Sequence, residues 1–264
     1  DDLHSIDLLM NFFMHKMFKF SFICLKETLF FSYPNVPGTL ISLAYQSFDK
    51  VMITNYRGMS ALGHYNIGEK FAGIFKMSTD SITRVFNPYF QDKAHEKSLD
   101  SKNDIVRLFY DLSGIYLLGA FVIICFSEEL IKLLTTPEFY PSIYIAPIFV
   151  FYYLFGAILN MVSVNQITYA KKLIFQIPVS IVSIIINISL NILLIPQYGA
   201  IGAVIATAVT ALVADILLLY FGQRAYFLPL NYKKLISMFV LIMLFTVPVY
   251  LLMLSDIHYF LKIL

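Results

Sequence analysis

The segment LGHYNIGEKFAGIFKMSTDSITRVFNPYF, residues 62–90, is long enough to cross a membrane, yet it carries a line of polar side chains. These side chains follow each other at steps of three or four residues, so they share one face of an α-helix. An ionisable side chain at the centre of a bilayer costs about 3 kcal/mol on insertion scales and is rarely kept there unless it faces a partner or a wet cavity. The segment therefore predicts a hydrophilic cavity inside a membrane bundle. The polar face consists of Asn66, Glu69, Gly73, Lys76, Asp80, Thr83 and Asn87.

The composition of the chain is that of an integral membrane protein. Of the 264 residues, 59% are hydrophobic and 14% are charged, whereas a soluble domain has about 25% charged residues. The net charge of +2 and the lack of basic runs interleaved with aromatic residues give no sign of a nucleic-acid partner. The sequence also has no metal-ligand spacing and no local phosphate-binding, zinc-protease or nucleophile motif. We therefore expect no metal, no cofactor and no enzymatic activity.

Apolar stretches bounded by charged residues predict seven membrane-spanning helices. The uncharged stretch 173–214 is far longer than the 20 or so residues that one span needs, and a turn signal at 196–199 divides it into two helices. Residues 1–33 mix lysines with apolar residues and are interpreted as an interfacial lead-in or the remnant of an earlier span. The predicted spans are 37–56, 62–90, 108–127, 139–170, the two halves of 173–214, and 235–255.

The cations outside these spans divide unevenly between the two sides of a membrane. The side that holds residues 1–33 receives twelve Lys and Arg residues, and the other side receives Arg57, Lys132 and Lys262. Such an excess marks cytoplasmic loops. We therefore predict that residues 1–33, 91–107, 171–172 and 222–234 are cytoplasmic.

Small residues at helical spacing predict a close contact between helices. Gly199 and Ala203, and likewise Gly202 and Ala206, are pairs four residues apart, which let helix backbones approach closely in lipid. Prolines inside the predicted spans are expected to kink or loosen them. These prolines are Pro147, Pro178 and Pro248.

Amide side chains recur on the apolar spans. Asn187 and Asn191 share a helical face, and Asn160, Asn165 and Gln166 occupy the preceding span. Interhelical hydrogen bonding is the favoured role for all of them, at an average of about 0.6 kcal/mol each. Cavity lining is the alternative.

Charged side chains within the segment 62–90 are the main candidates for binding. Lys76–Asp80 and Asp80–Arg84 are spaced as i, i+4 pairs, so mutual neutralisation is one explanation. A substrate-facing stripe also explains why further polar residues continue the same face. In that case Lys76 and Arg84 hold an anionic group such as a diphosphate. The predicted substrate-binding stripe is Asn66, Glu69, Lys76, Asp80, Thr83, Arg84 and Asn87.

Two adjacent charged residues lie inside the first predicted span. Asp49 and Lys50 point about 100° apart on a helix. Asp49 is expected to face the cavity or to cap a buried network, and Lys50 to snorkel toward the outer surface. Asp49 and Asp80 are the candidates for a carboxylate that couples transport to an ion gradient. Asp80 and Glu69 are also candidates for orienting the cations or for binding sugar hydroxyls.

Several stretches of the chain resemble one family of membrane transporters. SFDKVMI at 47–53 and GHYNIGEK at 63–70 are similar to the family's "D…vG.Y..a.k" stretch, and FNPYF at 86–90 is similar to the close of the same helix. NISLNILLIPQYGAIGA at 187–203 is similar to the family's "N..LN..LIP..G..GA" hairpin. By these motifs the chain resembles the polysaccharide and O-antigen flippases, in the superfamily that also holds the multidrug and toxin extrusion antiporters.

The resemblance implies an all-α integral membrane protein with two six-helix bundles facing a central cavity. Residues 34–226 are then the second six-helix transmembrane bundle, and 227–264 carry one extra helix. The first bundle is absent from the chain, and both ends look like cuts in a longer protein. The expected partners are therefore that N-terminal half, membrane lipid and the cargo.

The cargo that the resemblance implies is a glycan linked to a polyprenyl diphosphate carrier such as undecaprenyl diphosphate. It would be flipped across a bacterial inner (cytoplasmic) membrane by alternating access, driven by a proton or sodium gradient. One alternative is a cation-coupled multidrug antiporter of the same superfamily, which would use Asp49 or Asp80. Another is a membrane-embedded glycosyltransferase or polymerase, which the short predicted outer loops disfavour.

Overall fold

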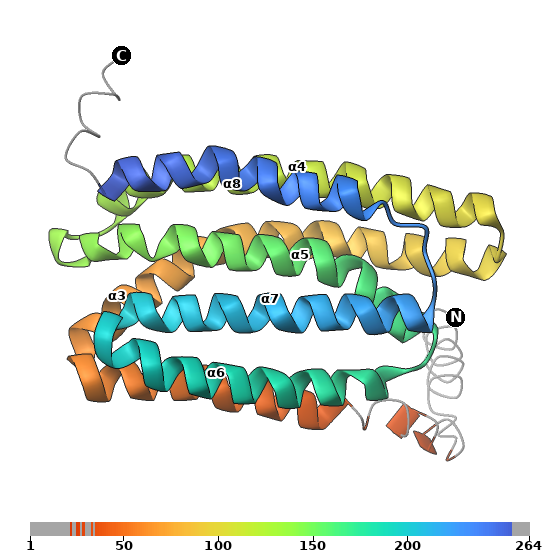
Figure 1. The fold of residues 1–264 in the computed structure, drawn as a ribbon, viewed down its shortest axis with the longest axis horizontal. Helices are drawn as coiled ribbons and strands as arrows, with labels where there is room; N and C mark the ends of the chain where they lie inside the picture. Colours follow the sequence, from red (N-terminus) through yellow and green to blue (C-terminus); the bar gives the residue numbers. More distant parts are fainter. Residues whose placement is uncertain (1–21, 23–24, 27, 30–32, 34, 255–264) are drawn as a thin grey trace, which may run out of the picture.

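The computed structural model describes residues 35–254 together with residues 22, 25, 26, 28, 29 and 33, and no side chain is described for residues 35, 37–47 and 252–254. The predicted lead-in 1–33 lies largely outside the described residues, as does the end of the predicted segment 227–264. All regular elements in the described part are helices, and most run along one common direction (Figure 1). The all-α fold class is therefore confirmed for these residues.

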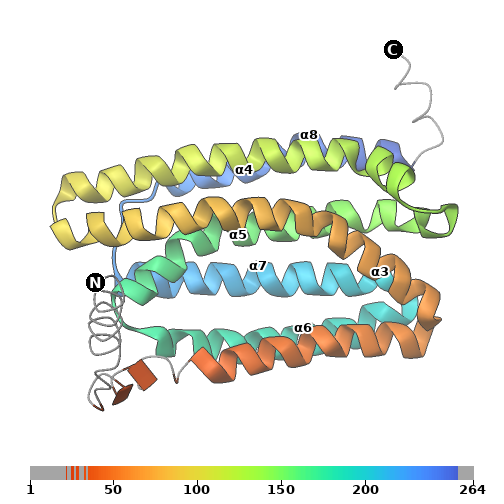
Figure 2. The same ribbon diagram turned by 180° about the vertical axis from the view of Figure 1, so that it is seen from behind.

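Helix α3 (Asn35–Glu96) contains both of the first two predicted spans. It consists of two arms joined at Gly58, whose φ of 80° and ψ of 177° are not helical. A positive φ is accessible to glycine at little cost. Figures 1 and 2 show that α3 folds back at this point, so that its two arms run in opposite directions along the bundle. Lys50 Nζ and Glu69 Oε2, 3.1 Å apart, connect the two arms.

Five helical segments in the described part are long and apolar enough to cross a membrane. They are α4 (Leu99–Leu134), α5 (Ala146–Tyr169), the segment Leu173–Tyr198 formed by η2 (Leu173–Phe175) and α6 (Gln176–Tyr198), α7 (Ala200–Ala225), and α8 (Tyr232–Leu254) over residues 232–251. The chain is thus a multi-pass membrane protein. The two arms of α3, which carry more charged side chains, are not among these segments. The seven-span count and the six-helix bundle therefore remain predictions.

The prediction that residues 91–107 form a loop is wrong, because nearly all of them are helical. Helix α3 continues to Glu96 and α4 begins at Leu99, so only Lys97 and Ser98 lie between the two helices. Lys97 adopts a positive φ of 55°, and the Ser98 hydroxyl accepts a hydrogen bond of 3.0 Å from the Ser101 backbone amide. This N-cap starts α4 earlier than hydropathy indicates, because a capped helix end tolerates charged residues in water.

Two of the three predicted proline kinks are also wrong. Pro147 and Pro178 lie in the first turns of α5 and α6, where a missing amide leaves no hydrogen bond unmade. The predicted span 139–170 begins only at Ala146, because the preceding residues form the 3₁₀ helix η1 (Pro137–Tyr144). Pro248 lies inside α8, where a kink remains the expectation.

The hairpin between α6 and α7 turns at a single residue. Gly199 has a φ of 60°, and α6 continues through Pro196 to Tyr198. Arg57 Nη2 donates hydrogen bonds of 2.7 Å to the carbonyl oxygens of Pro196 and Gln197. The last carbonyls of α6 have no partner within the helix, so this arginine caps the hairpin from the end of the first arm of α3.

The predicted close contact of small residues is confirmed at Gly202. A Cβ built on Gly202 would lie 2.4 Å from the Leu194 carbonyl oxygen. We expect Gly202→Ala to force α6 and α7 apart and to lower the free energy of unfolding by about 1–3 kcal/mol. Gly114→Ala in α4 is the control, because a Cβ there meets nothing within 4 Å and alanine favours a helix. Thermal unfolding in detergent measures both; equal melting temperatures for the two variants would contradict the contact.

The interior of the bundle is filled by aromatic and aliphatic side chains. Phe75, Phe149 and Leu154 are almost fully buried, and α5 packs against α3, α4 and α7. Large apolar side chains also cover the outside, such as Phe126 on α4 and Ile185 on α6. An apolar exterior of this extent marks a membrane-facing surface. The polar residues of α3 therefore lie in a bundle whose interior and exterior are mostly apolar.

Candidate functional site

A cavity of about 580 Å³ is lined by residues of α3, α5, α6 and α7. Its size falls in the range of about 300–1,000 Å³ that is usual for ligand pockets. The lining residues belong to the C-terminal halves of α3 and α7, the middle and end of α5, and the start of α6. These ends of the helices are connected by the segments predicted to be cytoplasmic. The cavity therefore lies in the half of the bundle nearer the predicted cytoplasmic side.

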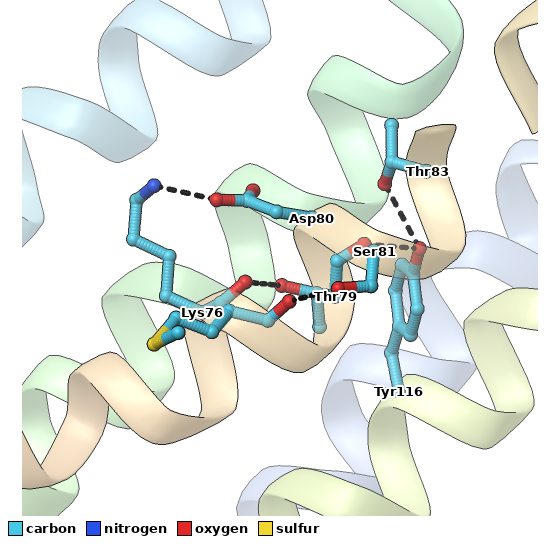
Figure 3. A network of polar contacts seen from close by, with 7 residues as sticks. Lys76, Thr79, Asp80, Ser81, Thr83 and Tyr116 are labelled. Carbon is cyan, nitrogen blue, oxygen red and sulfur yellow. Dashed lines mark hydrogen bonds and ion pairs between the residues drawn. The ribbon is translucent and has the colours of Figure 1, made fainter. Parts of the chain in front are cut away.

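Four residues of the predicted stripe line this cavity from α3: Lys76, Asp80, Thr83 and Asn87. Lys76 Nζ donates a hydrogen bond of 2.8 Å to Asp80 Oδ2, and both side chains are about half exposed, at 51% and 52%. Figure 3 shows this ion pair and, farther along the helix, the Thr83 hydroxyl in contact with the Tyr116 hydroxyl. The mutual neutralisation of Lys76 and Asp80 is confirmed by this ion pair, and the substrate-facing role of the stripe stays a prediction.

The other members of the predicted stripe do not line the cavity. Helical residues advance by about 100° each, so Thr83 and Asn87 return to within about 20° of Lys76. Arg84 and Asn66 lie about 80° away from Lys76 by the same geometry. Arg84 is exposed, and the predicted Asp80–Arg84 pair is absent among the described residues, where Asp80 pairs with Lys76 instead.

Glu69 lies two turns before Lys76 and is engaged elsewhere. Its carboxylate accepts a hydrogen bond of 3.1 Å from Lys50 Nζ. The prediction that Lys50 snorkels to the outer surface is therefore wrong, because a carboxylate on the opposite arm of α3 lies within reach. Glu69 does not orient Lys76 and instead holds the two arms of α3 together.

A tyrosine of α4 fixes the position of the stripe. The Tyr116 hydroxyl donates to the Thr79 carbonyl oxygen at 3.1 Å and lies 3.0 Å from Thr83 Oγ1. Tyr116 is 1% exposed, and Figure 3 shows it reaching the helix from the side away from Lys76. A buried hydroxyl with two partners resists rotation of α3, because turning the helix would leave the hydroxyl unpaired.

The wall opposite α3 is formed by amide and carboxylate side chains. Asn165 Nδ2 on α5 donates to Asn87 Oδ1 at 2.8 Å, and Asn160 Nδ2 donates to Asp215 Oδ1 on α7 at 2.9 Å. The predicted interhelical hydrogen bonds of Asn160 and Asn165 are confirmed, and both residues also line the cavity. Helix α6 completes this wall with neutral polar side chains: Gln176, Ser180 and Ser183.

Asp215 was not predicted as a site residue. The uncharged stretch of the sequence ends at Ala214, which places Asp215 at the predicted end of a span. Helix α7 in fact continues to Ala225, which places Asp215 well inside the helix, and its side chain is 5% exposed. The usable signal was a single carboxylate within a long apolar helix, since such residues usually mark a site in membrane proteins.

A second polar cluster lies outside this cavity. The Asp49 carboxylate accepts hydrogen bonds from Asn191 Nδ2 on α6 and, at 2.8 Å, from Thr207 Oγ1 on α7. Asn191 Nδ2 also donates to Asn187 Oδ1 at 2.9 Å. Asp49 is 1% exposed, so its predicted role in a buried network and the interhelical role of Asn187 and Asn191 are both confirmed. Thr207 precedes Asp215 by about two turns, or about 12 Å along α7.

Together these features define a class: a multi-pass, all-α membrane protein with a polar cavity inside an apolar bundle. No group of three or more His, Cys, Asp or Glu side chains that could hold a metal ion occurs in the described part of the chain. Comparisons with family models, with curated proteins and with solved structures found no match.

Proposed function

We propose that this chain is the substrate-carrying bundle of a flippase for lipid-linked oligosaccharides. The cargo would be a glycan on undecaprenyl diphosphate, moved from the cytoplasmic to the outer leaflet of a bacterial inner membrane by alternating access. The observation that carries the proposal is the cavity of about 580 Å³, lined by Lys76, Asp80, Asp215, neutral polar side chains and apolar side chains. Polar groups inside a membrane bundle cost free energy, and binding a polar cargo would explain why they are present.

Each wall of the cavity has a part in this proposal. Lys76 is the cation that would hold the diphosphate, and Asp80, 2.8 Å from it, would keep the ammonium positioned between cargoes. Hydroxyl and amide groups of Thr83, Asn87 and Asn165 suit the hydroxyls of a sugar, because each of them can donate or accept. Arg84 has no part in binding, since it lies outside the lining.

The exposed face of α3 supports the proposed N-terminal bundle as a partner. Lys76, Asp80 and Arg84 are all exposed on a helix of membrane length. Charged groups facing lipid cost about 2.5–3.5 kcal/mol each on insertion scales. A facing N-terminal bundle would cover them and close the cavity between the two halves.

Asp49 is the preferred candidate for the coupling carboxylate. It is buried among side chains of three helical segments, whereas Asp80 is half exposed and already paired with Lys76. A proton or a sodium ion entering beside Asp49 would change the contacts between α3, α6 and α7. Such a differential contact is what an ion needs in order to shift a conformational equilibrium.

A second function, cation-coupled drug export, has one observation in its favour. The ionisable side chains of the lining include two carboxylates, Asp80 and Asp215, and one ammonium group, Lys76. This excess of negative charge suits a cationic cargo better than it suits a diphosphate. The membrane-embedded glycosyltransferase or polymerase has no comparable support.

Reconstitution distinguishes these functions. The protein isolated from its native membrane is placed in liposomes with a fluorescent undecaprenyl-diphosphate oligosaccharide, and a membrane-impermeant quencher reports transfer between leaflets. We expect transfer to be faster than in protein-free liposomes. Uptake of a cationic dye without any transfer of the lipid-linked sugar would contradict the flippase and support cation-coupled drug export.

A further inference from the structure

Asp215 and Asn160 form a pair in the wall of the cavity whose hydrogen bonding is incomplete. Asn160 Nδ2 donates to Asp215 Oδ1 at 2.9 Å. The other two oxygens of the pair, Asn160 Oδ1 and Asp215 Oδ2, are buried and have no hydrogen-bond partner. Both atoms are acceptors, so the pair needs either a cation or a donor from outside the two side chains.

Gly156 borders the cavity beside the pair. Gly156 lies one helical turn before Asn160 on α5, and a Cβ built on it would lie 3.6 Å from both Asn160 Nδ2 and Asp215 Oδ2. A side chain at residue 156 would therefore contact the pair, and Gly156, Asn160 and Asp215 all line the cavity.

The charge of Asp215 has no dedicated counter-ion among the described residues. The titratable groups that line the cavity on the helices packed around it are Lys76 and Asp80 of α3 and Tyr152 and Tyr153 of α5. Lys76 Nζ is held by Asp80 at 2.8 Å, and α6 contributes neutral side chains only: Gln176, Ser180 and Ser183. Asp215 itself is 5% exposed.

The relative magnitudes favour a cation over a neutral donor. Leaving a buried acceptor without a hydrogen bond destabilises the folded state, and burying an ionised carboxylate without compensation destabilises it considerably more. A sugar hydroxyl would supply the missing hydrogen bond but would leave the buried negative charge largely uncompensated. A small cation would both compensate the charge and satisfy the two acceptors, because it binds the carboxylate and the amide oxygen together.

We propose that Asp215 and Asn160 form a binding site for a monovalent cation, a sodium ion or a proton, in the wall of the cavity. Asp215 Oδ2 and Asn160 Oδ1 are the ligand atoms for sodium, and Asp215 Oδ2 is the atom that takes up a proton. This site is distinct from the Asp49 cluster, about two turns away along α7. Its use in driving transport rests on the proposed carrier function, but cation binding itself does not.

Binding of the cation alone, without cargo, tests the site. Radioactive sodium bound per chain is counted for the purified protein in detergent, and infrared spectra record the carboxylic-acid band of a protonated side chain. Asp215→Asn should either remove one bound sodium ion per chain or abolish one carboxylic-acid band. Asp111→Asn, which changes an exposed carboxylate of α4, should do neither.

The sodium count and the infrared spectra distinguish the two cations. Loss of a sodium ion assigns the site to sodium, and loss of the acid band alone assigns it to a proton. Sodium binding and acid bands that are the same in Asp215→Asn and in the unmodified protein would overturn the proposal. If Asp215→Asn does not fold, Asn160→Ala replaces it, with an expected weakening of sodium binding of at least tenfold or a shift of the acid band. Because no cargo is used, a failure to flip lipid-linked sugar would leave this result unaffected.

Discussion

Replacing Lys76 with alanine is expected to reduce the flipping of a lipid-linked oligosaccharide at least tenfold, whereas replacing Arg84 with alanine is expected to leave it within twofold. Lys76 lines the cavity, and a hydrogen bond to a charged group contributes about 1.5–3 kcal/mol. Since 1.4 kcal/mol corresponds to a factor of ten, loss of this contact with a diphosphate has a large effect. The quencher assay in liposomes measures both variants.

Arg84 is a matched control because it is a cation on the same arm of α3, two turns from Lys76, and is not among the residues that line the cavity. A comparable loss in both variants would show that the charge of the whole helix matters rather than the geometry of the cavity. Full activity of Lys76→Ala would remove the diphosphate anchor from the proposal. Lys76→Arg is expected to retain part of the activity, because it keeps the positive charge.

The second large effect is expected at Asp49. Asp49→Ala removes the acceptor of two hydrogen bonds, those from Asn191 on α6 and Thr207 on α7. Bonds to a charged group contribute about 1.5–3 kcal/mol each, and removing a buried carboxylate offsets part of this loss. We expect a net decrease of about 2 kcal/mol in the free energy of unfolding. Thermal unfolding in detergent measures this change as a lower melting temperature.

Asp111→Ala provides the comparison, because Asp111 is an exposed carboxylate of α4. Its effect on the free energy of unfolding should stay within about 0.5 kcal/mol. Asp49→Asn keeps the shape of the side chain and should fall between the two alanine variants. A melting temperature of Asp49→Ala equal to that of Asp111→Ala would mean that the buried cluster adds nothing to the contact between α3, α6 and α7.

The order of helices followed from the sequence, because the length of an apolar run and its helical period are local properties. The runs at 173–214 and 235–255 became α6, α7 and α8, and Gly199 divides α6 from α7 as the turn signal indicated. Helix ends were less predictable. A serine cap at residue 98 depends on backbone geometry that hydropathy does not record, whereas the fold-back at Gly58 falls between the predicted spans 37–56 and 62–90.

The wetted face of α3 was determined by the sequence alone, since a period of three to four residues places Lys76, Asp80, Thr83 and Asn87 on one side of any helix. The opposite wall was decided only by the tertiary structure. Asn160 and Asp215 are separated by 55 positions in the chain, and nothing local connects them. The packing of α5 and α7 against α3 decided which residues of the predicted stripe line the cavity, and Arg84 is not one of them. Asp215 lines the cavity because α7 continues past it to Ala225.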